Sequence, residues 1–492
     1  MAWFWAALSL ILFLSLLQQL PKKRNLPPGP IALPIIGHLH LLGKNLHHEF
    51  HRLARKHGPI IFLHLGTVPA VVVSSAAGAE LVLKTHDLVF SGRPHHQASK
   101  HLGYDRRNIL FAPYGAYWRN MRKLCSLKLL NSQKVNEFRP IRKAELGEMV
   151  GSLRRAVEKR EIVDVSAAVA GVIGDMICLM VFGRKFVDRD LDEKGFKSVI
   201  DETMNLAALP NLGDFFPLMA ALDLQGLNRR MKELSVIFDG FLERIIDDHL
   251  QKKQETKQNQ DFVDTMLAVM ESGEAEFEFD RRHVKAVLLD MLIGGMDTSA
   301  STVEWAISEL IRHPKVMKKL QKELEQVVGM DQMVDESHLH KLNYLDLVVK
   351  ETLRLHPPGP LLIHVPSEDC KVNQFHVPKG SWIFVNVWSI GRDPNMWQDP
   401  QEFVPERFVG GDVDFLGQHF QYIPFGSGRR SCPGMQLGLI LVRLVLAQLV
   451  HCFDWELPHA MLPADLDMAE HFGVVTTRDK HLMAIPTYRL HK

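Results

Sequence analysis

The sequence predicts a mainly α-helical fold with a small β-sheet region, preceded by one N-terminal membrane-anchor helix. Helical periodicity runs through most of the chain, in segments of roughly 10 to 30 residues. Two stretches rich in β-branched residues interrupt this periodicity, at 59–74 and 371–390. The chain opens with an apolar run that carries no charge, over residues 1–17.

The composition limits the classes of protein to which this chain can belong. Of its 492 residues, 46% are hydrophobic, which supports a large core and excludes general disorder. The 58 Lys and Arg residues nearly balance the 57 Asp and Glu residues, so the charge gives no reason to expect a nucleic acid as partner. Five cysteines over this length exclude a disulfide-stapled secreted scaffold and favour a reducing compartment.

The N-terminal segment, residues 1–20, is expected to be a transmembrane anchor. Twenty helical residues span about 30 Å, which is the thickness of one hydrocarbon core. A cleaved signal peptide is the alternative. Against it, the positive charges of Lys22, Lys23 and Arg24 follow the apolar run, and the end of the run has no small-residue cleavage site. The positive-inside rule then predicts a single-pass protein whose remaining chain faces the cytosol.

A basic, proline-rich hinge is predicted at residues 21–37, because prolines fix φ and hold their neighbours extended. This segment is either a hinge that holds the following domain at a set angle to the membrane or a simple linker. No second break in composition follows, so residues 38–492 are expected to form one domain. Within it, 59–65 and 69–74 are predicted to form a β-hairpin, and 251–261 a solvated connector.

The strongest chemical signal is a glycine-rich loop, residues 424–434 (PFGSGRRSCPG), which leads into an apolar helix. A thiolate at the entrance of a helix, as Cys432 would be, is stabilised by the helix dipole and by unpaired backbone N–H groups. The glycines let the backbone approach a bulky flat ligand, and Arg430 is available for an anionic group. A buried, inert thiol is the alternative. We expect this for the other four cysteines, Cys125, Cys178, Cys370 and Cys452.

This loop resembles the FxxGxRxCxG signature of the cytochrome P450 haem-thiolate enzymes, which it matches with Phe425, Gly428, Arg430, Cys432 and Gly434. The other motifs extend the resemblance over essentially the whole chain, and it implies the cytochrome P450 fold for residues 38–492. It also implies that the cofactor is haem b, with Cys432 as the axial ligand of its iron. Arg430 would pair with a haem propionate, and Phe425 would shield the sulfur.

A long helix is predicted from the N-cap Asp280 to His313, where Pro314 stops it. Its middle carries Gly294 and Gly295, and a glycine in a helix interior costs about 1 kcal/mol relative to alanine. A helix needed only for packing would gain from alanine or leucine at these positions. The alternative is that hydroxyl side chains in this stretch bond back to carbonyls four residues earlier and merely bend the helix.

The same segment resembles the oxygen-activation groove of the P450 family, [AG]Gx[DE]T[TS], through Gly294, Gly295, Asp297, Thr298 and Ser299. The resemblance implies a local widening of the helix that admits dioxygen. It also implies that Thr298 and Asp297 are catalytic, because cleavage of an O–O bond requires proton delivery, for which an alcohol beside an acid is suited.

Two further motifs are expected to support the haem site. Glu351 falls on the buried face of its helix, where a charge is costly unless it is paired. Resemblance to the family's PERF segment implies a structural network of Glu351, Arg354 and Arg407. Trp118 and Arg122 share a helix face and resemble the family's WxxxR, whose arginine contacts a haem propionate. A basic amphipathic helix is the alternative for this second pair.

The resemblance implies an external monooxygenase on the endoplasmic reticulum membrane. The chain has no glycine-rich dinucleotide fingerprint after a strand, so NADPH would act only indirectly. Electrons would come from NADPH–cytochrome P450 reductase, and cytochrome b5 is a further candidate donor. The lipid membrane and a small substrate complete the expected partners.

The hinge, the cysteine loop and residues 388–394 most resemble plant microsomal members of specialised metabolism. Such members oxidise terpenoids, phenylpropanoids, biphenyls, flavonoids or alkaloids, so the expected reaction is hydroxylation of a lipophilic substrate. By the same resemblance the substrate pocket is almost wholly apolar. Its expected residues are Phe111, Ala112, Met291, Gly295, Leu362, Ile363, Val474 and Val475.

Two other functions compete with this one. A haem-thiolate isomerase or dehydratase would rearrange a hydroperoxide without reductase or dioxygen. Relatives of that kind usually depart from the Asp-Thr motif, which Asp297 and Thr298 keep here. A non-catalytic haem-binding carrier or sensor would not need a weakened helix beside a proton relay.

Overall fold

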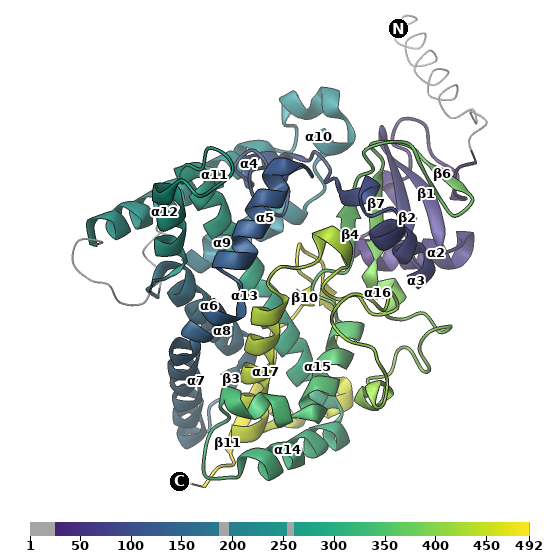
Figure 1. Ribbon diagram of the computed structural model, residues 1–492. Coiled ribbons are helices and arrows are strands. Elements are labelled where there is room, and N and C mark those ends of the chain that lie inside the picture. The colour runs from purple at the N-terminus through teal and green to yellow at the C-terminus, as the bar shows by residue number, and fades with distance from the viewer. Residues whose placement is uncertain (1–24, 186–195, 253–259, 492) are drawn as a thin grey trace, which may run out of the picture.

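The computed structural model describes residues 25–185, 196–252 and 260–491, so the predicted anchor at 1–20 lies outside the described residues. Helices make up most of the structure (Figure 1). The helix α2 packs on one face of the four-stranded sheet, and α3 packs on the other. The helices are α2 (Leu46–His57), α3 (Ala76–Glu80), α4 (Gln97–His101), α5 (Ala116–Lys128), α6 (Ser132–Glu137), α7 (Arg139–Lys159), α8 (Val165–Phe182), α9 (Phe196–Ala208), α10 (Leu212–Phe215), α11 (Leu227–Lys252), α12 (Phe262–Ser272), α13 (Arg281–Arg312), α14 (Pro314–Val328), α15 (Asn343–Leu355), α16 (Val387–Ile390) and α17 (Met435–Cys452).

The largest sheet has the strand order β1 (Ile60–Leu65), β2 (Val68–Val73), β7 (Trp382–Asn386) and β4 (Leu361–His364). β1 and β2 form the predicted antiparallel hairpin, β2 runs parallel to β7, and β7 runs antiparallel to β4. The smaller sheets join β3 (Val163–Asp164), β11 (Met483–Tyr488) and β8 (Phe453–Glu456); β5 (Cys370–Val372) and β6 (Phe375–Val377); and β9 (Glu470–His471) and β10 (Thr477–Arg478).

The mainly helical fold with a small β-sheet region is therefore confirmed, with one difference in detail. The stretch 371–390 contains the expected short strands but ends in the helix α16. This helix forms because the side chain of Asn386 caps it, accepting a hydrogen bond from the backbone N–H of Ser389 at 3.1 Å. The predicted connector at 251–261 falls mostly outside the described residues.

The described part of the predicted hinge, residues 25–37, lies against the sheet and does not stand free of it. The carbonyl of Pro28 accepts a hydrogen bond from Phe62 N at 2.9 Å, and Gly37 pairs with Leu65 in an isolated bridge. These contacts cover β1, an edge strand whose backbone groups would otherwise be open to another chain. The described part of the hinge is therefore docked on the edge of the sheet.

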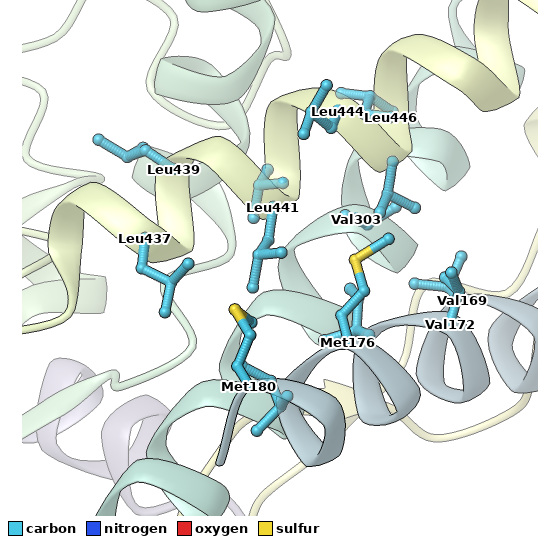
Figure 2. Close-up of a cluster of buried hydrophobic side chains, with 14 of the residues drawn as sticks. Val169, Val172, Met176, Met180, Val303, Leu437, Leu439, Leu441, Leu444 and Leu446 are labelled. Carbon is cyan, nitrogen blue, oxygen red and sulfur yellow. The ribbon is translucent and has the colours of Figure 1, made fainter. Parts of the chain in front are cut away.

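The core is built around α13, which packs against α8 and α17. Figure 2 shows methionines and valines of α8 meeting Val303 of α13 and the leucines of α17. Both α8 and α17 are long and apolar enough to cross a membrane by length and composition, but 67% of the apolar stretch of α8 and 72% of that of α17 is buried inside the protein. The described position of these two helices is therefore that of core helices.

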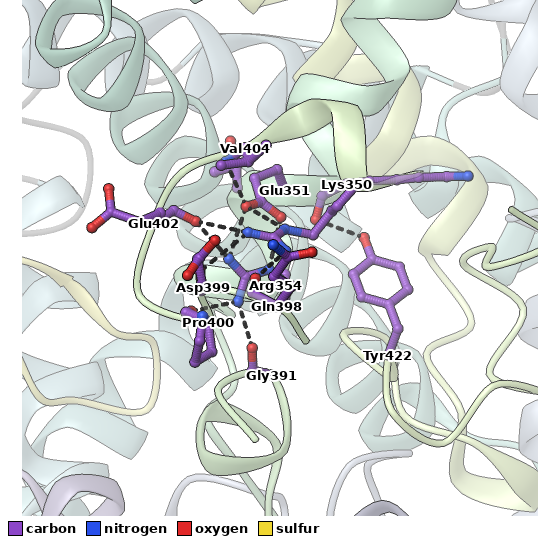
Figure 3. Close-up of polar contacts among 12 residues, drawn as sticks. Lys350, Glu351, Arg354, Gly391, Gln398, Asp399, Pro400, Glu402, Val404 and Tyr422 are labelled. Carbon is purple, nitrogen blue, oxygen red and sulfur yellow. Dashed lines mark hydrogen bonds and ion pairs between the residues drawn. The ribbon is translucent and has the colours of Figure 1, made fainter. Parts of the chain in front are cut away.

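A buried ion-pair network lies at the end of α15. Glu351 and Arg354 are 0% and 2% exposed, and they form a bidentate pair with N–O distances of 2.7 and 2.8 Å (Figure 3). Arg407 Nε donates to the same carboxylate at 2.9 Å, and the backbone N–H of Val404 donates to it at 2.8 Å. The structure thus brings together the three residues that the sequence assigns to a structural network.

The two arginines of this network also hold the loop that precedes the cysteine loop in sequence. Arg354 Nη1 donates to the carbonyls of Gly391 at 2.6 Å and Pro400 at 2.7 Å. Arg407 Nη1 donates to the carbonyl of Gln398 at 2.6 Å. Since the charges are buried and every contact is short, the network fixes residues 391–407 on α15.

We expect Glu351→Gln to lower the free energy of unfolding by about 3–5 kcal/mol, because it leaves two buried guanidinium groups without their carboxylate. Chemical denaturation of the purified protein would measure this change. Glu80→Gln is the matched control, since the Glu80–Lys84 pair is exposed and its loss changes stability by less than about 1 kcal/mol. Equal denaturation midpoints for the two variants would contradict the importance of the network.

Candidate active site

The loop before α17 holds Cys432 in a fixed position. The backbone N–H of Cys432 donates to the carbonyl of Phe425 at 2.8 Å, which closes the loop on itself. Gly426 and Gly428 have φ values of +71° and +68°, a left-handed conformation that glycine adopts without strain. A Cβ atom at Gly428 would in addition collide with the carbonyl oxygen of Leu83. Backbone conformation and close approach therefore explain the glycines that surround this thiol.

The side chain of Cys432 faces a hollow inside the protein. It is exposed to solvent, yet desolvation raises the pKa of its thiol, and both hold when the accessible surface is concave. The N–H of Gly434 and the charge of Arg122 oppose this rise. The N–H at the helix entrance thus acts in the expected direction, although burial outweighs it for the free thiol. A bound metal cation would deprotonate the sulfur.

Three guanidinium groups, those of Arg93, Arg122 and Arg430, lie in this part of the molecule. The guanidinium of Arg430 lies 4.2 Å from the centre of the Trp118 ring, and that of Arg122 lies 6.0 Å from it. Burial lowers the pKa of Arg93 to about 10 and that of Arg430 to about 9. Within the described ranges, no carboxylate forms an ion pair with any of the three. Desolvated cations without a counter-ion favour the binding of an anionic group.

Arg430 also has a task that the sequence motif does not indicate. It donates to three backbone carbonyls, those of Ser91 at 2.9 Å, Ile109 at 3.2 Å and Ala112 at 2.7 Å. Two of the five N–H groups of its guanidinium remain for another acceptor. A propionate would therefore share Arg430 with the loop at 108–112.

Two residues of this cluster were missed by the sequence motifs. Arg93 donates to the carbonyl of Leu110 at 3.1 Å and to that of Ile363 in β4. The ring of His364 bonds the carbonyl of Phe90 at 2.8 Å, and burial together with the nearby arginines lowers its pKa to about 3, so the ring is neutral. A lone arginine in a loop and a histidine at the end of a strand carry no pattern that could have marked them.

The helix α13 runs from Arg281 to Arg312 through the segment of the expected groove. The hydroxyl of Thr298 donates to the carbonyl of Gly294 at 2.7 Å, which is the back-bonding named above as the alternative. A Cβ at Gly295 would lie 2.7 Å from Ile177 Cδ1 of α8, whereas a Cβ at Gly294 would meet nothing within 4 Å. A side chain at position 295 would therefore displace Ile177, whereas position 294 has space for a Cβ atom.

The cysteine loop and the Thr298 turn meet where α17 begins. A Cβ built on Gly438, in the first turns of α17, would lie 3.8 Å from Ser299 Oγ. The N–H of Gly438 donates to the carbonyl of Gly434, two residues after Cys432, at 2.8 Å. The fold thus brings the residue after Thr298 into contact with the helix that follows Cys432. Asp297, partly buried, precedes Thr298 on α13.

Contacts tie the expected pocket segments to this region. A Cβ at Gly426 would lie 3.7 Å from Leu362 Cδ1, which places β4 beside the cysteine loop. The hydroxyl of Ser301 donates to the carbonyl of Thr476 at 2.7 Å, and this bond holds the segment after Val475 against α13. Ile363 accepts the hydrogen bond from Arg93 through its carbonyl.

Exposure separates the expected pocket residues from one another. Phe111 and Met291 are partly accessible, and Val474 is 39% exposed. Ala112 is 0% exposed and Val475 9% exposed, so their side chains do not offer open surface to a ligand. Ala112 contributes its carbonyl to Arg430 instead.

These features fit a haem. Haem is a flat group that carries two carboxylates and an iron that takes a thiolate as axial ligand. The described residues offer the thiol of Cys432 facing a hollow and guanidinium groups that have no carboxylate partner. The guanidinium groups therefore match the carboxylates of a haem, and the thiol of Cys432 matches its iron.

Comparison with known proteins agrees with this geometry. The chain matches the protein family described as Cytochrome P450 over residues 27–484. It is 47% identical to cytochrome P450 CYP736A12 of Panax ginseng, over 97% of this chain and 96% of that protein. It is 41% identical to flavonoid 3'-monooxygenase CYP75B137 of Crocosmia x crocosmiiflora, over 98% of this chain and 96% of that protein. A third relative, the 4-hydroxyphenylacetaldehyde oxime monooxygenase of Sorghum bicolor, is 43% identical over 94% of this chain and 88% of its own. The chain therefore belongs to the cytochrome P450 family and is a haem-dependent monooxygenase of the plant type.

Proposed function

We propose that this monooxygenase uses dioxygen and electrons from NADPH–cytochrome P450 reductase to hydroxylate a small lipophilic plant metabolite. The meeting of the cysteine loop with the Thr298 turn of α13 carries this proposal. Relatives named as a flavonoid 3'-monooxygenase and an oxime monooxygenase support a substrate from specialised metabolism. The proposed classes are terpenoids, phenylpropanoids, biphenyls, flavonoids and alkaloids.

The proposed roles at the cofactor follow from charge. Cys432 Sγ would bind the haem iron, and Arg122 with the free N–H groups of Arg430 would hold the propionates. When bound, the haem would supply the redox chemistry that activates dioxygen. Phe425 would cover the sulfur side, and Trp118 would hold both guanidinium groups against its ring.

The proposed proton path uses Thr298 and Asp297. A hydroxyl has one proton to donate and two lone pairs. While Thr298 Oγ1 donates to Gly294, its lone pairs remain free to accept a proton from water or from an acid. Rotation of the hydroxyl hydrogen toward the open space beside Gly294 would then deliver a proton there, and Asp297 would resupply it.

The competing functions are less well supported. The hydroxyl of Thr298 lies at the carbonyl of Gly294, and Asp297 precedes it on α13. An alcohol next to an acid in sequence suits proton delivery, which a hydroperoxide isomerase or a haem carrier does not need. The relatives named as monooxygenases favour the same choice.

We propose an anchor at 1–20, a hinge at 21–37 and a catalytic domain at 38–492 that faces the cytosol on the endoplasmic reticulum membrane. The support is a set of exposed apolar side chains in and near the described part of the hinge. Ile31 is 92% exposed and Leu218 99% exposed, and the neighbouring Leu222 is 64% exposed. The carbonyl of Phe215 accepts from Thr67 N at 3.0 Å, so the segment that carries these leucines packs on the β1–β2 turn beside the hinge. Such a patch fits the lipid surface to which the anchor would hold it.

We expect Cys432→Ser to lose the red-shifted Soret band of the reduced carbon monoxide complex, because a serine oxygen does not replace a thiolate on iron. Difference spectra of the membrane-bound protein would measure this. Cys370→Ser, which alters a partly exposed cysteine elsewhere, is the control and should keep the band. Survival of the band in Cys432→Ser would contradict the assignment of Cys432 as the iron ligand.

We expect Thr298→Ala to keep its haem and to lower the yield of product per NADPH roughly tenfold or more, with the electrons diverted to peroxide. The assay combines the protein, the reductase and a substrate identified by a metabolite screen in microsomes. Thr302→Ala is the matched control, since Thr302 is 3% exposed and bonds back to the carbonyl of Thr298. An unchanged coupling in Thr298→Ala would argue against the proton path.

We expect a tryptophan at position 218 to lie at membrane depth. In full-length protein reconstituted in vesicles with brominated acyl chains, Leu218→Trp should show stronger quenching of the added fluorescence than Val409→Trp. Val409 is also exposed, at 65%, but lies in the loop after Phe408, near the Glu351 network. Equal quenching at the two positions would remove the support for this membrane-facing surface.

A further inference from the structure

A partly buried acidic residue, Asp290, lies on α13 on the same face as the oxygen-side residues, four positions before Gly294 and eight before Thr298. None of the sequence motifs includes it. Its Oδ2 accepts a hydrogen bond from the backbone N–H of Ile109 at 2.6 Å, and its Oδ1 accepts one from Asn108 Nδ2 at 2.8 Å. Asp290 therefore binds the loop at 108–112 from the side of α13.

The second of these bonds passes to a residue of the expected substrate pocket. Asn108 is 4% exposed, and its Oδ1 accepts the backbone N–H of Phe111 at 3.2 Å. Because the amide nitrogen of Asn108 is directed at Asp290, its oxygen must face Phe111. The carboxylate of Asp290 thus sets the orientation of the amide that holds Phe111.

The carbonyl side of the same loop is bound by cations. Ile109 O accepts from Arg430 Nη1 at 3.2 Å and from Trp118 Nε1 at 3.0 Å. Leu110 O accepts from Arg93 Nε at 3.1 Å. The loop at 108–112 therefore donates hydrogen bonds to Asp290 on one side and accepts hydrogen bonds from the arginines on the other. Asp290 is the anionic partner in this arrangement.

The surroundings of Asp290 leave its charge sensitive to pH. Burial raises the pKa of Asp290 to about 7, and the bonds from Ile109 and Asn108 act in the opposite direction. No cation forms an ion pair with Asp290 within the described ranges. Its charge acts on Tyr117 and Cys125, and the charge of Arg107 also acts on Tyr117. A protonated carboxyl carries a hydrogen on one oxygen and no charge, so it accepts the two hydrogen bonds from the loop more weakly than the carboxylate does.

We propose that Asp290 is a positioning residue that sets the conformation of the loop at 108–112 and thereby the shape of the substrate side of the haem pocket. This inference rests on the proposed function, because it takes the hollow at Cys432 to be the haem pocket. The ionised carboxylate holds the loop in place, and protonation loosens it.

The experiment compares two nitrogenous haem ligands of different size in wild type and Asp290→Asn. Imidazole is small, whereas the phenyl ring of 4-phenylimidazole would extend from the iron into the pocket that, under this proposal, the loop at 108–112 shapes. We expect Asp290→Asn to keep its haem and its affinity for imidazole, and to bind 4-phenylimidazole about tenfold more weakly, because the new amide leaves a backbone donor unsatisfied. Asp465→Asn, at an exposed carboxylate, is the matched control and should behave as wild type.

A pH series separates positioning from a general loss of stability. Asp290 loses its charge as the pH falls through about 7, so the wild-type advantage for 4-phenylimidazole should be largest above that pH and vanish below it. Taking the ratio of wild type to variant cancels the titration of the ligand itself. A ratio that does not change with pH would overturn the proposal.

Asn108→Ala tests the route from Asp290 to Phe111. It should weaken 4-phenylimidazole less than Asp290→Asn does, and the double variant should be weaker by less than the sum of the two effects, because both act on one loop. Equal weakening of imidazole and 4-phenylimidazole, or loss of haem in Asp290→Asn, would show a purely structural role and overturn the proposal. Failure of the proposed function is distinct, since wild type would then give no ligand spectrum at all.

Discussion

Within the described residues, guanidinium groups that have no carboxylate partner determine how the segments around Cys432 are arranged. A desolvated cation is stabilised by an anion or by hydrogen-bond acceptors, and Arg93 and Arg430 find their acceptors in backbone carbonyls. Loop 108–112, the segment at Ser91 and strand β4 therefore take positions around these two side chains. An anionic ligand would stabilise all three segments together, because it would neutralise the charge that they share. Cofactor binding and the shape of the substrate side are thus linked through the same arginines.

In the Glu351 network, by contrast, the buried arginines are paired with a carboxylate. One carboxylate accepts from both Arg354 and Arg407, and the remaining N–H groups donate to carbonyls of the loop 391–402. Its charges are closed to any ligand, so their effect is to fix that loop on α15. The arginines near Cys432 keep N–H donors available, as a site for an anionic ligand requires. The arginines of the Glu351 network use their donors within the protein, as a purely structural network requires.

The sequence predicted what local motifs encode. The hairpin at β1 and β2, the caps of α13 at Asp280 and His313 and the buried face of Glu351 follow from short-range patterns, and the structure has them. The sequence could not predict Arg93, His364 and Asp290, because each acquires its environment from segments far away in the chain. It also explained Gly295 by function, whereas the contact with Ile177 of α8 gives a packing reason that only the fold reveals.

One face of α13 carries Asp290, Gly294 and Thr298, because positions four residues apart lie above one another on a helix. Asp290 holds the loop at 108–112, Gly294 leaves space one turn later, and Thr298 bonds to the carbonyl of Gly294 one turn further. A residue with a side chain at position 294 would occupy the space between the loop anchor and the hydroxyl. The absent Cβ therefore serves the site, while the neighbouring glycine serves the packing of α8. Since Asp290 and Thr298 sit on one rigid helix, a loop held by the first keeps a constant distance from the second.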